Sequence, residues 1–289
     1  MVRDIEETFQ TLRRINMKLN PKKCSFGLAE GVFLGYVITP EGIKPCLDKT
    51  AAVLQLPSPQ TIKEVQSLNG KLASLNRFLS KSAEKSLPLF QTLKKCIKKR
   101  DFHRTLEAEQ AFQQLKQHLS ALPMSAAPKP REELIMYLSA MHGAISAVLM
   151  TERETTQTSV YFISRVLQGP ELNYSPMEKL VLSLVFAAKR LRRYFQAHPI
   201  TVITDHPIKQ IMSRPDVAGR LQKWSIMLGE HNITYRPRTS TKGKVLADFL
   251  NEMPSNASQG VPVAETQEEP WTLFTDGSSC VDGQAQGSY

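Results

Sequence analysis

Lysine and arginine side chains are the groups whose chemistry is easiest to assign from this sequence. The formal net charge is +10, and the excess is uneven along the chain. Residues 1–130 hold 21 Lys and Arg against 11 Asp and Glu, residues 131–255 hold 16 against 11, and residues 256–289 hold none against 5. Cations that neutralise phosphates release condensed counterions, so the first two segments are predicted to bind a polyanion. Solubility alone is the other explanation of the same charge.

The densest cationic run lies at residues 94–100, where five of seven side chains are basic. A run of charge is more often a solvated surface than a binding site. We favour phosphate contact here because the charge of the surrounding segment agrees with it. The candidate nucleic-acid contacts in this run are Lys94, Lys95, Lys98, Lys99 and Arg100.

Neither cysteine chemistry nor membrane insertion is supported by the sequence. Cys24, Cys46, Cys96 and Cys280 show no Cys-x-x-Cys pair and no histidines at metal-ligand spacing, so reduced structural thiols are expected. The first residues are acidic where a signal peptide needs an apolar core, and the apolar run at 180–188 is far too short to span a bilayer. A cytoplasmic or nuclear location without a membrane partner is therefore expected.

The first 130 residues are predicted to be mainly helical around one small β-hairpin. Residues 4–19 have helical apolar spacing and end at Asn20-Pro21, and the runs 22–26 and 32–38 are β-prone. Thr61 and Glu64 form a capping box that opens a helix. Its apolar stripe is Ile62, Val65, Leu68, Leu72, Leu75 and Leu79. A further helix at 107–119 is followed by a proline-rich boundary.

A second domain is predicted from Arg131, with three hairpin-linked strands before alternating helices and strands. The fold class is α/β (α+β), with a mixed sheet covered by helices. The expected strands are 134–138, 144–150, 160–163, 200–204 and 233–235, and the expected helices are 176–195, 219–228 and 245–250. The long helix should bury Leu180, Val181, Leu184, Val185, Ala188 and Leu191. Residues 253–270 have the composition of a flexible linker.

Three carboxylates at the ends of these elements have simple structural explanations. Ser175-Pro176-Met177-Glu178 is a capping box with proline at the first helical position, so Glu178 is expected to close a helix end. Asp205 precedes His206-Pro207-Ile208 and could cap the next short helix. Asp248 could be a solvated position on the last helix.

The chain resembles the Pol polyprotein of gypsy-type LTR retrotransposons, in a plant-type form. The runs Leu19-Asn20-Pro21-Lys22-Lys23-Cys24, Phe33-Leu34-Gly35-Tyr36 and Gln66-Ser67-Leu68-Asn69-Gly70 resemble the palm end and thumb of the reverse transcriptase. Residues 131–251 resemble its ribonuclease H-like domain, on landmarks at 160–164, 174–179 and 204–207. Thr275-Asp276-Gly277-Ser278 resembles the opening of a second ribonuclease H domain.

This resemblance divides the chain into five segments. Residues 1–44 would be the end of the palm with a primer-grip-like hairpin, and residues 45–130 the thumb and connection. Residues 131–252 would be the ribonuclease H-like domain, residues 253–270 the linker, and residues 271–289 the start of a second such domain. By the same analogy, the primer end would be positioned by Phe33, Leu34, Gly35 and Tyr36, although core positions of a hairpin also explain Phe33 and Val37.

Two departures from the family limit the activity that the resemblance implies. Reverse transcriptases need an Asp-Asp pair that binds two metals, and no Asp-Asp dipeptide occurs in this sequence, so polymerase activity is not expected of it. The nuclease domain uses Asp, Glu, Asp and Asp to hold two Mg²⁺ ions. Glu178, Asp205 and Asp248 match three of them, but Ser139 stands at the first position. Serine offers one uncharged oxygen and cannot replace a bridging carboxylate.

Three functional hypotheses remain. The first is a fragment, inactive by itself, that binds an RNA/DNA hybrid or duplex and works beside the rest of the Pol polyprotein. The second is a ribonuclease H that cleaves the RNA strand with Mg²⁺ on Glu178, Asp205 and Asp248, and the third is a remnant without function. Asp276 has the catalytic setting of the family but would be an isolated ligand. If the other carboxylates converge, Ser139→Asp is expected to raise hybrid cleavage.

Overall fold

The computed structural model of the 289-residue chain describes residues 2–95, 105–154, 156–213 and 219–238 together with Phe249, with the backbone alone for residues 92–95. The chain divides into two compact units, Met1–Pro254 and Ser255–Tyr289. All of the described residues belong to the first unit. The predicted helix at 245–250, apart from Phe249, and the predicted segments 253–270 and 271–289 lie outside the described residues.

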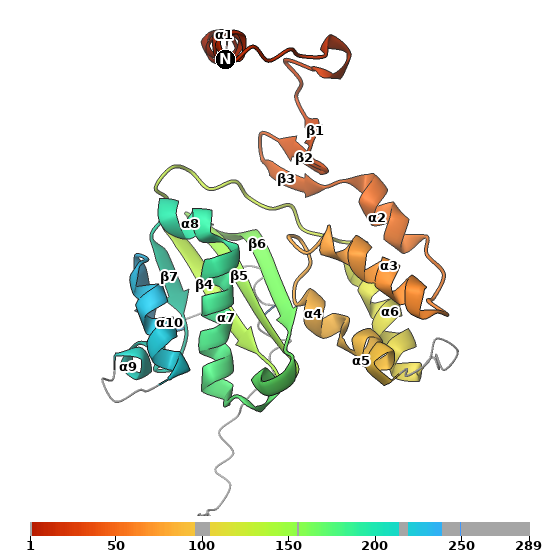
Figure 1. The fold of residues 1–289 in the computed structure, drawn as a ribbon, viewed down its shortest axis with the longest axis vertical. Helices are drawn as coiled ribbons and strands as arrows, with labels where there is room; N and C mark the ends of the chain where they lie inside the picture. The colour runs from red at the N-terminus through yellow and green to blue at the C-terminus, as the bar shows by residue number, and fades with distance from the viewer. Residues whose placement is uncertain (1, 96–104, 155, 214–218, 239–248, 250–289) are drawn as a thin grey trace, which may run out of the picture. The chain divides into compact units, whose positions relative to one another are not determined.

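A five-stranded mixed sheet forms the centre of the second half of this unit (Figure 1). Its strand order is β6-β5-β4-β7-β8, with β4 antiparallel to β5, β5 antiparallel to β6, and β7 parallel to both β4 and β8. The strands are β4 Leu134–Ala140, β5 Ala144–Arg153, β6 Thr156–Val166, β7 Ile200–Ile203 and β8 Ile233–Arg236. The prediction of a mixed sheet whose first three strands are antiparallel is confirmed.

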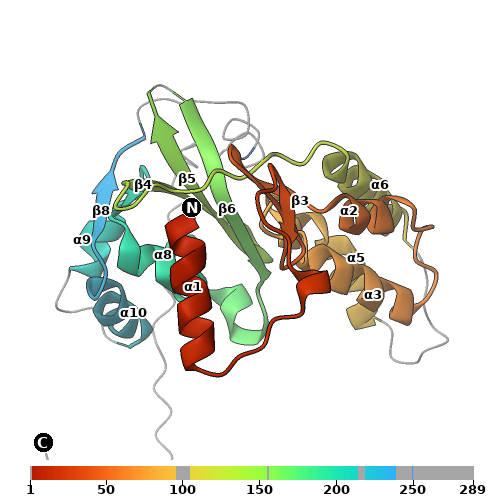
Figure 2. The same ribbon diagram turned by 90° about the horizontal axis from the view of Figure 1, so that it is seen from above.

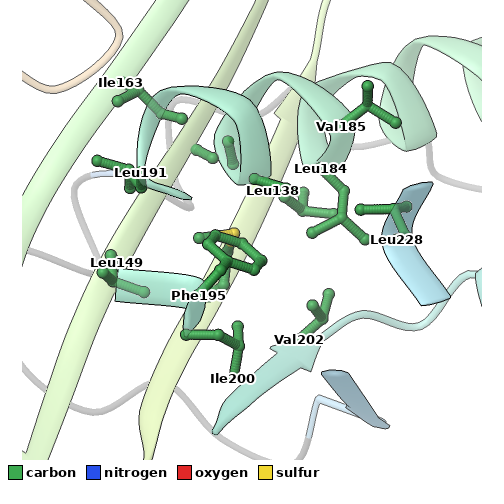
Figure 3. Close-up of a cluster of buried hydrophobic side chains, with 14 of the residues drawn as sticks. Leu138, Leu149, Ile163, Leu184, Val185, Leu191, Phe195, Ile200, Val202 and Leu228 are labelled. Atoms are coloured by element: carbon green, nitrogen blue, oxygen red, sulfur yellow. The ribbon is translucent and has the colours of Figure 1, made fainter. Parts of the chain in front are cut away.

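The helices of this half cover one face of the sheet. Figure 1 shows α7 packed across the strands, and Figure 2 shows α9 next to β8 with α10 beyond it. These elements are η2 Gly169–Asn173, α7 Pro176–Arg190, α8 Arg192–Ala197, α9 Ile208–Met212 and α10 Arg220–Gly229. The six residues of the predicted apolar stripe of α7 are all buried. Figure 3 shows Leu184 of α7 beside Leu138 of β4 and Leu228 of α10 in this core.

The predicted single helix at 176–195 is two helices in the structure. Leu191, with φ −106° and ψ 29°, leaves the helical region between α7 and α8. Leu191 stays buried, and so does Phe195 one turn later. The bend keeps both side chains in the core at the end of the sheet (Figure 3), which a straight helix would leave.

The helices α2 to α6 precede this sheet in the chain, and four of them, α2, α3, α5 and α6, enclose a second hydrophobic core. The bounds of the five helices are α2 Leu47–Leu54, α3 Ile62–Ala73, α4 Ser82–Lys85, α5 Leu87–Lys95 and α6 Leu106–Leu119. The predicted Thr61 cap of α3 is present, because its side chain accepts a hydrogen bond from Glu64 N. Five residues of the predicted stripe are buried, and Ile62 is half-buried. Helical spacing therefore located this core correctly, although α3 itself ends at Ala73.

A hairpin is present in residues 22–38, but its two strands are not the runs 22–26 and 32–38 that were predicted. Residues 21–23 form a 3-10 turn (η1) under an Asn20 cap, and the run 32–38 is split by a turn at Leu34-Gly35. Both turn residues have positive φ, 49° and 78°, as a tight two-residue hairpin turn requires. The sheet has the order β1 Gly31–Phe33, β2 Tyr36–Thr39 and β3 Gly42–Pro45. The first helix, α1, spans Val2–Arg14 rather than 4–19.

Among the described residues, the helices are all too short or too polar to cross a bilayer.

Candidate functional site

Ser139 lies near the end of β4, where it is paired with Ser146 of β5 and is almost fully buried. Alternate residues of a strand point to opposite faces. Leu138 packs into the core beneath α7, whereas Tyr137 packs with Phe249, so Ser139 belongs to the face of Tyr137. The position predicted to lack a carboxylate therefore holds a buried hydroxyl.

Asp205 follows β7 at the same end of the sheet as Ser139. In the parallel register Tyr137 is opposite Ile203, so Ser139 and Asp205 each stand two residues further along. Asp205 Oδ1 accepts a hydrogen bond from the backbone N–H of Arg238 at 2.9 Å, and its Oδ2 lies 3.7 Å from Arg238 Nε. The predicted cap of the next helix is wrong, because α9 has Pro207 at its N-cap and no side-chain cap.

Glu178 closes the first turn of α7 in the predicted capping box. Its backbone N–H donates to Ser175 Oγ at 3.2 Å, and its Oε2 accepts from Ser175 N at 3.0 Å. Its other oxygen, Oε1, pairs with Arg220 Nε at 3.4 Å. The Arg220 guanidinium also lies over the Tyr174 ring, 4.1 Å from its centroid. Both oxygens of this carboxylate are thus engaged within the protein.

The two described carboxylates of this set each have an arginine partner, Arg220 for Glu178 and Arg238 for Asp205. Magnesium prefers an octahedral shell of oxygen ligands at about 2.1 Å, usually one or two carboxylates together with waters and phosphate oxygens. Glu178 is held by Ser175 and Arg220, Asp205 is held by Arg238, and Ser139 brings no charge. Within the described ranges, no group of three His, Cys, Asp or Glu side chains could hold a metal. Asp248 and Asp276 lie outside the described residues.

The candidate primer-contact residues surround the β1–β2 turn. Phe33 and Leu34 are largely exposed, so the alternative of a core role is wrong for Phe33, while Val37 is half-buried. A side chain at Gly35 would collide with the end of Lys49, and its φ of 78° also favours glycine. Tyr36 is half-buried against Phe78, with a ring centroid distance of 5.8 Å. The turn thus presents apolar side chains outward and turns Tyr36 inward.

The cationic run of residues 94–100 cannot be placed. Lys98, Lys99 and Arg100 lie outside the described residues, and so do the side chains of Lys94 and Lys95. The structure instead reveals basic and aromatic residues that were not selected from the sequence. Arg77 lies over the Tyr161 ring at 5.0 Å, and four exposed cations occur at residues 189–193. The Lys-Arg-Leu-Arg-Arg run at this second place was a visible signal, since four of its five residues are basic.

The segment that forms most of the five-stranded sheet and its helices matches a known protein family. Residues 129–231 match the family described as "RNase H-like domain found in reverse transcriptase". This segment is a reverse transcriptase RNase H-like domain. The match covers β4 to α10, so the RNase H-like domain includes Ser139, Glu178 and Asp205.

Relatives of the chain that contains this RNase H-like domain are retrotransposon Pol polyproteins. The chain is 31% identical over 230 residues to the retrovirus-related Pol polyprotein from transposon 297 of Drosophila melanogaster, covering 78% of this chain and 21% of that protein. It is 26% identical over 289 residues to the transposon Tf2-3 polyprotein of Schizosaccharomyces pombe, covering 97% of this chain and 21% of that protein. The chain thus spans about a fifth of these relatives. They do not decide the gypsy-type and plant-type assignments, which stay predictions.

Solved structures share the fold of the RNase H-like domain and the preceding helices. One is the foamy viral protease-reverse transcriptase in complex with an RNA/DNA hybrid, with 20% identity, a TM-score of 0.67, and coverage of 94% of this chain and 36% of that one. Another is a form of the same viral protein in complex with double-stranded DNA, with 20% identity, a TM-score of 0.64, and coverage of 83% and 43%. The fold predicted from the sequence is therefore confirmed.

Proposed function

We propose that this chain is a segment of a retrotransposon Pol polyprotein that binds an RNA/DNA hybrid or duplex without cleaving it. Its RNase H-like domain serves as a binding and linking domain beside the other parts of the polyprotein. In this proposal, affinity comes from Lys and Arg contacts to backbone phosphates. Binding is then micromolar or weaker and has little sequence preference, as is typical of phosphate-dominated binding.

One observation carries the non-catalytic part of the proposal. Two arginines pair with the carboxylates that were predicted to bind metal ions. Arg220 lies beside Glu178, and Arg238 lies beside Asp205. Each pairing brings a positive charge where hydrolysis would need a divalent cation. Bound magnesium in a competent site would polarise the scissile phosphate and activate water. The described residues include no group of three His, Cys, Asp or Glu side chains that could hold such an ion. Glu178 therefore acts as a helix cap, and Asp205 holds the segment after β8 through its hydrogen bond from Arg238 N.

The binding part of the proposal is supported by charge and by similarity. Residues 1–130 and 131–255 both carry an excess of Lys and Arg, whereas the last 34 residues carry only acidic charges. The matched foamy viral structures are complexes with double-stranded DNA and with an RNA/DNA hybrid. When a basic protein neutralises phosphates it releases counterions, so log K falls linearly as the logarithm of the salt concentration rises.

A fluorescently labelled hybrid tests both parts with the purified chain. Anisotropy titrations at about 50 and 200 mM salt should show binding that weakens steeply as salt rises. An affinity that ignores salt would contradict phosphate-dominated binding. Incubation of the same hybrid with Mg²⁺ should leave the RNA strand intact.

The Ser139→Asp variant sharpens the cleavage test. Because Glu178 and Asp205 remain held by arginines, the added carboxylate alone should not produce magnesium-dependent cleavage. Asp205→Asn is the matched control for the residual site. Robust cleavage by the wild-type chain that disappears in Asp205→Asn would overturn the non-catalytic assignment and favour an active ribonuclease H.

A further inference from the structure

Four exposed cations surround the bend between α7 and α8. Lys189 and Arg190 end α7, and Arg192 and Arg193 begin α8. All four are exposed, and none makes an ion pair with another described residue. We call these four residues the basic ridge. Buried Leu191 lies between the two pairs and anchors the bend in the core.

Helix stability explains only half of the basic ridge. Cations in the last turn of a helix interact favourably with its dipole, which accounts for Lys189 and Arg190. Arg192 and Arg193 stand instead in the first turn of α8, where the dipole favours acidic residues. Like charges this close together repel one another unless an anion lies between them. The ridge therefore has a concentration of charge that the fold itself does not use.

A row of tyrosines adjoins the basic ridge. Tyr194 of α8 packs edge-on against Tyr161 of β6, with ring centroids 6.5 Å apart. The Arg77 guanidinium lies 5.0 Å from the centroid of Tyr161 and 5.9 Å from that of Tyr36. We call Tyr36, Tyr161 and Tyr194, with Arg77 between the first two, the tyrosine ladder. It connects the β1–β2 turn to α8 and draws its four residues from four segments that are far apart in the sequence.

Arg77 and Tyr161 have hydrogen-bonding capacity that no described residue uses. The Nε and Nη2 atoms of Arg77 are buried and have no hydrogen-bond partner within the described part of the chain. Burial, with the nearby Tyr36 as a smaller cause, raises the pKa of Tyr161 above its ordinary value. The Tyr161 hydroxyl thus stays protonated at neutral pH and can donate a hydrogen bond. A phosphate oxygen is a suitable acceptor for the Tyr161 hydroxyl. The buried Arg77 guanidinium lies near the Tyr36 and Tyr161 rings and adds positive charge beneath them.

We propose that the basic ridge and the tyrosine ladder form a binding site for the sugar–phosphate backbone of a nucleic acid strand. The proposal rests on the proposed function and assigns it a location on the RNase H-like domain. The ridge cations would pair with successive phosphates, and the tyrosines would offer hydroxyl donors and ring faces to the sugars and bases. Aromatic groups beside cations are the usual composition of such sites. A purely acidic protein partner would use the charges but not the rings.

A charge-matched pair of triple variants of the full chain tests this location. In the ridge variant, Arg190, Arg192 and Arg193 are each replaced by Gln. In the control variant, the exposed Lys129, Lys209 and Lys223 are replaced in the same way, so both lose three charges. Anisotropy with a labelled RNA/DNA hybrid is measured at several salt concentrations. The ridge variant should bind at least about tenfold more weakly, with a salt slope reduced by roughly 2 to 3, whereas the control changes less than about threefold.

Each outcome of this experiment is informative. Equal losses in the two triple variants would refute the ridge as the site while leaving nucleic-acid binding intact. If the wild-type chain itself shows no salt-dependent binding, the proposed function fails and the site fails with it. Because the replaced side chains are exposed, equal thermal midpoints are expected. Should the ridge variant melt early, the single variants Arg190→Gln and Arg193→Gln must each weaken binding, or the proposal is overturned.

The tyrosine ladder has its own test. Tyr161→Phe removes one hydroxyl donor and keeps the ring, so hybrid affinity should fall by about threefold to tenfold at constant salt slope. Tyr235→Phe is the matched control, since Tyr235 is a half-buried tyrosine of β8 in the same domain. Equal affinities of the Tyr161→Phe variant and the wild-type chain would remove the ladder from the site.

Discussion

Single carboxylates in this protein have roles that their sequence positions do not reveal. Glu178 and Asp205 stand where the resemblance predicted metal ligands, yet their oxygens meet Ser175, Arg220 and Arg238. A carboxylate near a guanidinium is neutralised locally, which removes the negative potential that a divalent cation needs. A serine at the predicted first-aspartate position, Ser139, and the arginine partners of Glu178 and Asp205 both agree with the proposal that the chain does not cleave.

Glu132 shows how much a fully bonded carboxylate contributes to stability. It pairs with Arg153 at 3.0 Å and also accepts hydrogen bonds from Thr151 and from Lys129 N, and its side chain is only 14% exposed. The bonds from Arg153 are the largest cause that lowers its pKa to about 2. The folded-state pKa lies below the unfolded value, so the stabilisation is complete above about pH 4.5 and is lost as pH falls toward 2.

The matching variant is Glu132→Gln. We expect it to lower the free energy of unfolding by about 1–3 kcal/mol at pH 7. Near about pH 2.5 the loss should be much smaller, because the carboxyl of the unfolded chain is then protonated and most of the stabilisation is already gone. Urea unfolding at the two pH values measures this. Glu230→Gln, at an exposed position after α10, should have little effect at either. A loss that does not depend on pH would show that the Glu132 charge is not the cause.

At the scale of elements, α7 holds the RNase H-like domain together. Its face toward β4 and β5 includes Leu180, Val181, Leu184 and Val185, and Ser183 Oγ donates to the Ser146 carbonyl of β5 at 2.8 Å. The capping box at Ser175 and Glu178 fixes where the helix begins, and the turn at Leu191 fixes where it ends. The C-terminal end of α7 also positions the basic ridge, so buried Leu191 supports both the core and the proposed binding site.

Shortening a buried side chain of α7 should therefore lower the stability of the domain. Leu184 is fully buried in this core (Figure 3), and Leu184→Ala is expected to lower the free energy of unfolding by about 2–5 kcal/mol through lost contacts and a cavity. Ile226→Ala, on the exposed side of α10, is the comparison and should change it by less than about 1 kcal/mol. Thermal or urea unfolding followed by circular dichroism measures both. Similar losses in the two variants would contradict the assignment of the buried face.

At the scale of the whole unit, two cores are joined along the edge strand β6. The larger lies between the sheet and α7, and the other lies among α2, α3, α5 and α6. Phe162 N donates to the Arg77 carbonyl at 3.0 Å, and Ser164 Oγ bonds to Ser82 Oγ at 2.7 Å and accepts from Ala83 N at 2.8 Å. The Phe162 bond pairs one backbone group of this edge strand, which would otherwise be left open, and the Ser164 bonds tie α4 to the same strand.

Ser164→Ala tests this junction. The variant leaves Ala83 N–H and the Ser82 hydroxyl without their acceptor and partner, a penalty of about 1–3 kcal/mol. Hydrogen exchange should therefore become faster in peptides that cover α4, with little change in β4 and β7. Ser213→Ala is the control, because that exposed hydroxyl bonds only within its own helix, to Lys209 O. Unchanged exchange in α4 would show that the junction does not depend on Ser164.

The sequence by itself determined the elements and the fold class. Helical spacing identified α7 and its buried residues, alternation and turns identified β4 to β6, and Ser175 with Glu178 identified the start of α7. These features depend on residues close together along the chain, where the periods of the helix and the strand are fixed by backbone geometry. The absence of a carboxylate at Ser139 was equally visible, because it needs only the residue type.

Only the tertiary structure decided what each polar side chain meets. Arg220 and Arg238 are 42 and 33 residues away from the carboxylates they engage, and no local pattern links them. The break at Leu191 was missed because helix propensity does not register the curvature of the core beneath it. The tyrosine ladder draws Tyr36, Arg77 and Tyr161 from three separate segments. Long-range contacts depend on packing, which the spacing of residues along the chain does not encode.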